Sequence, residues 1–116
     1  MENTLQKENT IERVSVKEYN GSHRVDTLAT TLAKLEEIWG KAHYFNETDY
    51  PDDGYKTSVC MGWKNKETGK SIALWDYKNW NYNSEDINPQ ELISFSIYYE
   101  NIEDFNTLKN SLNAVN

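Results

Sequence analysis

The first candidate for a chemical site in this 116-residue chain is a short acidic stretch. Residues 49–54 contain three aspartates and a glycine, which resembles a calcium-binding loop. In such a loop, oxygen ligands alternate and a bidentate glutamate closes the site at the twelfth position. A loop that begins at Asp49 would place Pro51 at the third position and Cys60 at the twelfth. The pattern therefore predicts a turn, and we expect no metal site.

The second candidate is a nucleophile. Cys60 and His43 could form a thiol–imidazole pair, but Cys60 stands between Val59 and Met61 in a strand-like stretch, which favours a buried and unreactive thiol. The two histidines, His23 and His43, lack the spacing of metal ligands. The sequence contains no phosphate-binding loop, glycine-rich dinucleotide turn or serine elbow. We therefore predict that the chain is not an enzyme and uses no cofactor.

The third candidate is a binding surface in the stretch LWDYKNWNYN, residues 74–83, which holds two tryptophans and two tyrosines. Contiguous exposed aromatic side chains mark binding sites. The predicted aromatic platform consists of Trp75, Tyr77, Lys78, Trp80 and Tyr82. In the alternative, residues 78–90 fold back and bury Trp80 and Tyr82. Both interpretations remain open at this stage.

A strand through this stretch would divide its side chains between two faces. One face would carry Ile72, Leu74 and Asp76, and the other would carry Ala73, Trp75 and Tyr77. Since two helices can cover only one face of a sheet well, we expect the face with Trp75 to stay partly open.

The net charge of −7 and the pI near 4.8 argue against binding to a nucleic-acid backbone, which requires clustered Lys and Arg. Residues 83–116 alone carry six acidic side chains and one basic side chain. They predict an acidic partner-binding surface formed by Glu100, Glu103 and Asp104, which would meet a protein with a basic surface. The alternative is an acidic helix and loop that are simply solvated.

The elements that position these residues follow from hydrophobic periodicity. Residues 11–19 predict a strand. Residues 26–40 predict a helix capped by Asp26 or Thr27, with a helix stop at Gly40. Its apolar stripe comprises Leu28, Leu32, Leu35 and Trp39. Residues 41–56 are expected to form a long connection.

Residues 55–63 and 71–77 predict a hairpin around a turn that contains Gly69. Residues 91–100 predict a fourth strand, and residues 101–115 predict a helix that begins with a capping box at Asn101 and Asp104. The order is β-α-β-β-β-α. We therefore predict an α+β fold: a single antiparallel sheet of about four strands with two helices on one face.

Composition bounds the organisation and the compartment. Residues 1–10 are polar and predict a disordered tail, and residues 11–116 predict one domain. No apolar run is long enough to span a membrane, and the polar N-terminus does not resemble a signal peptide. A single cysteine is typical of a reducing compartment. We therefore expect a cytoplasmic protein with no membrane partner.

Residues 18–78 resemble a group of small uncharacterised phage proteins. In that group a helix ends in a Phe-Gly stop, and a tryptophan-bearing strand, a glycine turn and an Ile-Tyr-Asp-Trp-Lys-like strand follow. The counterparts are Trp39-Gly40, Trp63 and the stretch ALWDYK at 73–78. After Lys78 the chain departs from the group, with SFSIYY and an added helix in place of a final Trp-Ile-Gly-Gly-like strand. The resemblance implies an origin in a virus or a mobile element.

Three functions remain under this interpretation. The first is a phage-encoded inhibitor of a bacterial defence system, of the anti-CRISPR kind, that binds a host effector protein with a basic surface. The second is a sponge that sequesters a nucleotide signal, with Trp75 and Trp80 stacking on a base while Lys78 or Arg24 meets phosphate. The third is a structural or assembly protein of the virion.

Overall fold

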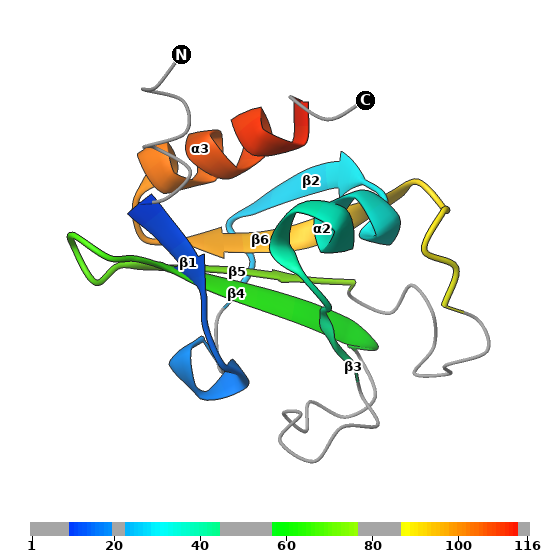
Figure 1. The fold of residues 1–116 in the computed structure, drawn as a ribbon, viewed down its shortest axis with the longest axis horizontal. Helices are drawn as coiled ribbons and strands as arrows, with labels where there is room; N and C mark the ends of the chain where they lie inside the picture. Colours follow the sequence, from blue (N-terminus) through cyan, green and yellow to red (C-terminus); the bar gives the residue numbers. More distant parts are fainter. Residues whose placement is uncertain (1–9, 20–22, 45–56, 77–86, 114–116) are drawn as a thin grey trace.

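The computed structural model describes residues 10–19, 23–44, 57–76 and 87–113. They form an α+β fold in which a six-stranded antiparallel sheet carries two α-helices on one face (Figure 1). The strands are β1 (Ile11–Arg13), β2 (Asp26–Thr30), β3 (His43–Tyr44), β4 (Val59–Asn65), β5 (Ser71–Trp75) and β6 (Ile93–Tyr99). The helices are the 3-10 helix η1 (Val16–Glu18), α2 (Leu32–Trp39) and α3 (Ile102–Asn113).

The strands lie in the order β1-β4-β5-β6-β2, and β3 also pairs with β4. β4 and β5 form the predicted hairpin, in which Gly69 adopts φ of +77° in the connecting turn. The α+β class, the antiparallel pairing and the two helices are therefore confirmed. The predicted count of about four strands and the predicted element order are wrong, because β2 and β3 arise where the sequence predicted a helix and a connection.

The predicted helix over 26–40 is wrong in its first five residues. Residues 26–30 form β2, which pairs with β6 so that Leu28 lies opposite Phe95. The helix starts only after Thr31, whose Oγ1 accepts a hydrogen bond from the Lys34 N–H at 3.1 Å. Threonine favours strands and helix caps over helix interiors. Gly40 ends the helix with φ of +88°, as predicted.

The end of the first strand also differs from the sequence-based expectation. The first predicted strand, 11–19, stops at Arg13 and continues into η1. The Arg13 guanidinium donates through Nη1 to the Trp39 and Gly40 carbonyls at 3.0 and 3.2 Å, so β1 holds the C-terminal end of α2. Residues 1–9 lie outside the described residues, and the predicted tail therefore stays a prediction.

The main core lies between the helices and the sheet. Trp63 is fully buried, and its ring meets Trp39 edge-on, with centroids 5.9 Å apart. Tyr99 of β6 stacks on Phe105 of α3 at 5.2 Å. The buried apolar side chains that share this layer are Ile11, Leu32, Leu35, Ala42, Val59, Met61, Trp63, Ile72, Leu74, Ile93, Phe95, Ile97, Phe105, Leu108 and Leu112.

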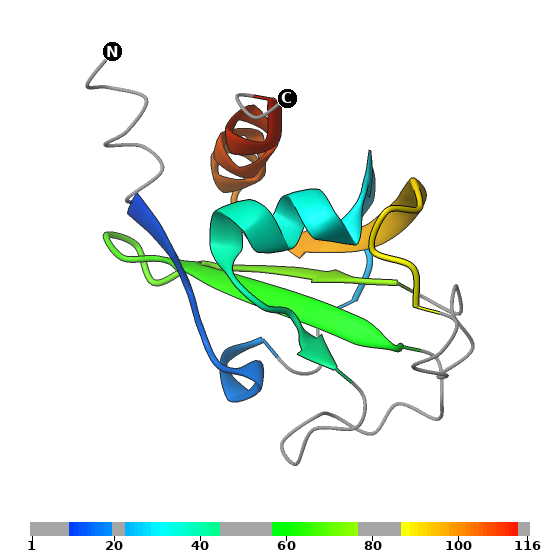
Figure 2. The same ribbon diagram turned by 45° about the vertical axis from the view of Figure 1, so that its right-hand side comes forward.

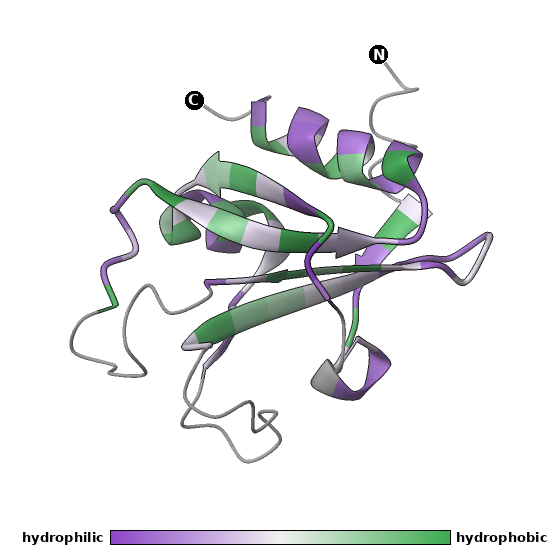
Figure 3. Ribbon diagram, turned by 180° about the vertical axis from the view of Figure 1, so that it is seen from behind, coloured by the Kyte–Doolittle hydropathy of each residue, from purple (hydrophilic) through white to green (hydrophobic). Residues whose placement is uncertain are grey.

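Figure 3 shows the same division by hydropathy: hydrophobic residues line β4, β5 and β6, and hydrophilic residues mark the β4–β5 turn and much of α3. Neither α2 nor α3 is long and apolar enough to cross a membrane, and this statement covers only the described residues.

Candidate functional site: the open face of the sheet

The face of the sheet opposite the helices is the candidate site, and we call it the open face. Ile72, Leu74 and Asp76 are buried on the helix side, and Ala73 and Trp75 point the other way, as the alternation predicted. Cross-strand pairing assigns the other members, since directly paired residues share a face. They are Cys60 and Gly62 on β4, Ala73 and Trp75 on β5, Ser94, Ser96 and Tyr98 on β6, and Thr27 and Ala29 on β2.

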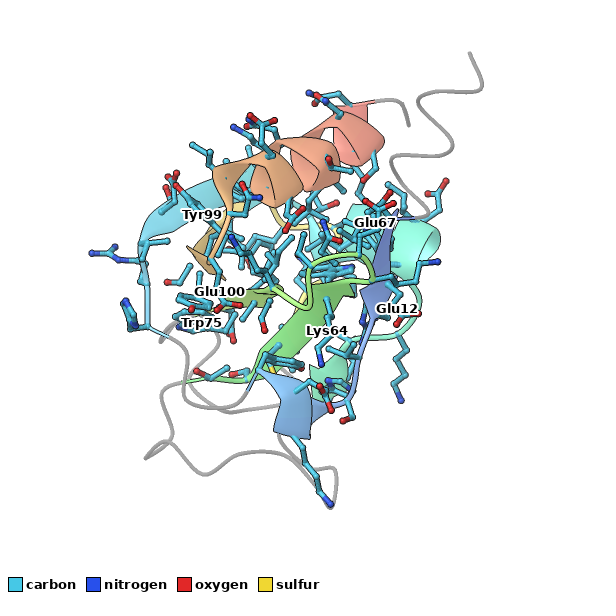
Figure 4. The ribbon with its side chains drawn as sticks, turned by 90° about the vertical axis from the view of Figure 1, so that its left-hand side faces the viewer. Glu12, Lys64, Glu67, Trp75, Tyr99 and Glu100 are labelled. Carbon is cyan, nitrogen blue, oxygen red and sulfur yellow. The ribbon has the colours of Figure 1, made fainter. Side chains whose placement is uncertain are left out.

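Trp75 is the last residue of β5, the middle strand in the sheet order. Its direct cross-strand neighbours are Cys60 on β4 and Ser96 on β6, and its ring is half-buried. Figure 4 shows Tyr99 on the side of α3 and Trp75 on the opposite side of the sheet. The other members of the predicted platform, Tyr77, Lys78, Trp80 and Tyr82, lie outside the described residues.

The carboxylate of Asp76 fixes the end of the strand that carries Trp75. Asp76 is 1% exposed, and its Oδ1 accepts hydrogen bonds from the Ser58 and Val59 N–H groups at 2.7 and 2.9 Å. Charge-assisted bonds of this kind are about twice as strong as neutral ones. Trp75 is therefore presented from a strand end that is anchored to β4.

Tyr19 covers one part of the open face. Its ring lies against Gly62, and a Cβ added to Gly62 would be 1.7 Å from the ring atom Cδ1. Tyr19 packs in a small second cluster with Cys60 and Ala73. Sequence reasoning did not identify Tyr19 as part of a site. The available signal was the glycine inside a strand, which often marks the close approach of another group.

Tyr19 also brings together the two residues considered for nucleophilic chemistry. His43 and Cys60 are direct cross-strand partners, and the Tyr19 hydroxyl lies 2.5 Å from His43 Nδ1 and 3.3 Å from Cys60 Sγ. Cys60 is only 4% exposed. The thiol is thus buried, as predicted, and the Tyr19 hydroxyl lies within hydrogen-bond distance of it.

A second aromatic pair lies beside Ala73, the cross-strand partner of Tyr98. The rings of His23 and Tyr98 are 5.2 Å apart and tilted by 57°. His23 is exposed and Tyr98 is half-buried, so both add accessible ring surface to that of Trp75. Neither residue was predicted to join the aromatic platform, because their proximity depends on the pairing of β2 with β6.

The predicted acidic surface is only partly correct in its placement. Glu100 and Glu103 are exposed, and Glu100 Oε1 accepts a hydrogen bond from the Ser71 N–H at 2.6 Å. Asp104 is 5% exposed, and its Oδ1 accepts from Asn65 Nδ2 at 2.8 Å. Placing Asp104 on an exposed surface was wrong, because α3 turns that position toward β4. Asn101 does cap the helix through the Glu103 N–H at 3.0 Å.

The end of the open face near the β4–β5 turn carries both signs of charge. Lys64 Nζ lies 2.6 Å from Glu18 Oε1, and Glu12 is the cross-strand partner of Lys64. The hydrogen bond to Glu18 and the charge of that carboxylate raise the pKa of Lys64 above its ordinary value of 10.5. This end of the face is therefore a mixed-charge rim.

Most of the chain's net negative charge comes from residues outside the described ranges. The residues outside the described ranges include eight acidic and three basic side chains, against eleven and nine within them.

Within the described ranges, no three His, Cys, Asp or Glu side chains are grouped to hold a metal ion. The stretch 49–54 lies outside those ranges.

Comparisons with known proteins add no relative: no protein family matches the chain, no curated protein is similar to it, and no solved structure matches its fold.

Proposed function

We propose that this chain is a non-enzymatic binding protein that engages another protein through its open face, with Trp75 as the central contact. The observation that supports this proposal is the half-buried Trp75 on a sheet face that neither α2 nor α3 covers. Tryptophan and tyrosine are enriched in protein interfaces and supply much of their binding energy.

The surroundings of Trp75 suit a docking surface. Thr27, Ala29 and Ser94 are small and exposed, so that a partner can approach the sheet closely beside the ring. Glu12, Lys64 and Glu100 form a polar rim toward the β4–β5 turn. A ring surrounded by small side chains and edged by charges corresponds to the core and rim of a protein interface.

The partner in this proposal is a bacterial defence effector with a basic surface, and the chain is a phage-encoded inhibitor of the anti-CRISPR kind that acts in the host cytoplasm. The net charge of −7 supports a basic partner, because opposite charges steer association. The resemblance of residues 18–78 to small phage proteins supports the origin. Among the acidic surface residues predicted from the sequence, Glu100 and Glu103 remain candidates, and Asp104 does not.

A second candidate function is a sponge for a nucleotide signal. Trp75 favours it, because an accessible indole ring can stack on a base with about 1–3 kcal/mol. Arg24 and His23 are exposed at the start of β2 and could meet phosphate. No described feature favours a role in the virion, which stays a prediction.

The test compares Trp75→Ala with Leu92→Ala, which removes an exposed apolar side chain at the start of β6. Each tagged variant is used to capture partners from lysates of bacterial hosts, and the dissociation constant of the purified partner is then measured. We expect Trp75→Ala to weaken binding by about 2 kcal/mol or more, as at interface hot spots, and Leu92→Ala to leave it unchanged. Equal affinity of wild type and Trp75→Ala for the partner would refute the proposal.

The same variants separate the two functions. Cyclic dinucleotides should leave the melting temperature of the wild-type protein unchanged if the open face binds a protein. A clear rise in the wild type that Trp75→Ala abolishes would favour the nucleotide sponge.

A further inference from the structure

A thiol, a hydroxyl and a base meet on the open face. His43 of β3 and Cys60 of β4 are direct cross-strand partners, and the Tyr19 hydroxyl lies 2.5 Å from His43 Nδ1 and 3.3 Å from Cys60 Sγ. Tyr19 follows directly after η1, and Figures 1 and 2 show η1 on the side of the sheet away from α2 and α3. Three separate segments of the chain therefore converge on one thiol.

The Tyr19 hydroxyl connects the thiol to the imidazole. A phenolic hydroxyl has one proton to donate and an oxygen that also accepts. When His43 Nδ1 carries no proton, the hydroxyl donates to that nitrogen and its oxygen accepts from the Cys60 thiol. The thiol and the base are then joined by a chain of two hydrogen bonds.

Moving two protons along this chain ionises the thiol. The thiol proton passes to the Tyr19 oxygen while the Tyr19 proton passes to His43 Nδ1, so that a thiolate, a neutral tyrosine and an imidazolium result. The Tyr19 hydroxyl then donates to the thiolate, and hydrogen bonds to a charged acceptor are about twice as strong as neutral ones. Burial disfavours a thiolate that stands alone. Here the imidazolium forms beside the thiolate, and the net charge of the three side chains does not change.

We propose that Cys60 is a site of oxidation by hydrogen peroxide, with Tyr19 and His43 taking up the thiol proton. A base that is linked to a thiol in this way activates it as a nucleophile. The thiolate attacks one peroxide oxygen, the O–O bond breaks, and the other oxygen leaves as hydroxide. The proton held by His43 passes back through Tyr19 to the hydroxide, which becomes water. The sulfur is oxidised to a sulfenic acid, the first and reversible stage of cysteine oxidation, and the peroxide is reduced.

The burial of the thiol selects a small oxidant. Cys60 is 4% exposed, and the ring of Tyr19 packs with it and lies against Gly62. Hydrogen peroxide needs far less displacement of this ring than a bulky aromatic disulfide does, so the thiol should discriminate between oxidants by size. Cys60 is also the single cysteine of the chain, and no second thiol of the same chain can convert the sulfenic acid into a disulfide.

The oxidised sulfur would lie beside the proposed binding contact. Cys60 is the direct cross-strand neighbour of Trp75, so that a sulfenic oxygen adds a polar atom next to this residue. The thiol chemistry itself depends on Tyr19, His43 and Cys60 alone, and it is independent of the proposed function.

Trapping of the sulfenic acid with dimedone, followed by mass spectrometry of the intact chain, tests the proposal. Folded wild type and wild type unfolded in guanidinium chloride are treated with hydrogen peroxide at neutral pH. An ordinary thiol is mostly protonated under these conditions, so we expect the folded chain to form the adduct about tenfold faster than the unfolded one. A bulky aromatic disulfide should show the opposite order, with the folded chain reacting more slowly.

Two variants test the groups that take up the proton. Tyr19→Phe removes the hydroxyl and keeps the ring over Gly62, and His43→Gln removes the base. Each should slow adduct formation in the folded chain about tenfold, because the thiol then stays protonated. Tyr99→Phe removes a hydroxyl on the helix side of the sheet and should leave the rate unchanged. Circular dichroism of each variant establishes that the fold is intact.

Three results would overturn the proposal. The first is a folded wild type that reacts with peroxide no faster than the unfolded chain, a comparison that needs no variant. The second is a wild-type rate in Tyr19→Phe or in His43→Gln. The third is a Tyr19→Phe variant that reacts faster with both peroxide and the aromatic disulfide, which would mean that Tyr19 only shields the thiol.

Discussion

The ring of Tyr19 occupies the space that a side chain on Gly62 would need. An added Cβ would lie 1.7, 2.2 and 2.4 Å from three atoms of that ring, and Gly62 sits in the middle of β4, where the backbone has little freedom to move. The close approach also sets the Tyr19 hydroxyl beside His43 and Cys60. Gly62 is thus required by the residue that packs over it.

Gly62→Ala should therefore destabilise the fold by about 1–3 kcal/mol, the usual cost of overpacking a close-packed site. Urea unfolding followed by circular dichroism measures the change. The double variant Gly62→Ala/Tyr19→Ala should lose less stability than the sum of the two single variants, because removal of the ring makes room for the methyl group. Additive losses would mean that the ring does not press on Gly62.

Asp76→Ala should cost about 2–5 kcal/mol, because the buried N–H groups of Ser58 and Val59 would lose their acceptor. Asp76→Asn keeps an oxygen at this position and should lose clearly less stability. Thermal and urea unfolding of the pair give the comparison. If Asp76→Asn proves as damaging as Asp76→Ala, the charge of the carboxylate matters more than its two hydrogen bonds.

Asn65→Ala should destabilise the chain by about 2–4 kcal/mol. Asn65 donates to the buried Asp104 carboxyl group, and its own Oδ1 accepts from the Glu67 and Thr68 N–H groups at 2.8 and 3.1 Å. The substitution therefore strips α3 and the β4–β5 turn of a shared anchor. Thr68→Ala, in the same turn but exposed, is the matched control and should cost much less. A loss below about 0.5 kcal/mol for Asn65→Ala would rule out this anchoring role.

The pair formed by Lys64 and Glu18 makes a pH-dependent contribution. The raised pKa of Lys64 means that the folded state holds this proton more tightly than the unfolded chain does. The stabilisation is therefore fully present below the unfolded-state pKa, near 10.5, and is lost as the pH rises through the folded-state pKa. Wild type should lose more stability than Lys64→Gln between pH of about 9 and about 11.5, and urea unfolding at both values checks this. Parallel curves for the two proteins would show that the pair is not formed in solution.

Charge reversal at Glu100 and Glu103 tests the acidic surface in the proposed function. Glu100→Lys/Glu103→Lys should slow association with a basic partner, and the slowing should shrink as salt increases, because screening acts over about 8–10 Å. Glu37→Lys/Glu91→Lys, at two exposed positions outside the predicted acidic surface, makes the same change in net charge and serves as the control. Stopped-flow association at two salt concentrations gives the rates. Unchanged association rates for the double variant would show that Glu100 and Glu103 do not contribute to association, so that binding would rest on the open face alone.

How much of this fold the sequence predicts depends on how far apart the paired strands are along the sequence. The alternation in β4, β5 and β6 is strong, and the β4–β5 turn is local, so these strands and the open position of Trp75 were predictable. β2 was not, because Leu28 continues the helical spacing of Leu32 and Leu35. Residues 26–30 form a strand because they pair with β6, and this tertiary pairing overrides the local preference for a helix.

For the candidate site, too, the sequence predicts the local features and misses those that depend on distant strands. Trp75 follows from the local alternation, whereas Tyr19, His23 and Tyr98 come together only through the pairing of distant strands. Asp104 was misplaced because its neighbours Glu103 and Asn101 suggested an exposed first turn. The donor that makes its burial tolerable, Asn65, is far away in the sequence, and no local pattern points to it.

The sheet order has a consequence for how the chain is made. Both outer strands from the N-terminal part, β1 and β2, pair with strands that are synthesised much later, β4 and β6. A growing chain therefore carries Ile11–Arg13 out of the ribosome with no partner until Asn65 has emerged, and Asp26–Thr30 with no partner until β6 has emerged. Such long-range pairing places folding in the slower, millisecond-to-second regime of sheet proteins. The interval before the last strand appears is when the nascent chain would most need protection by chaperones.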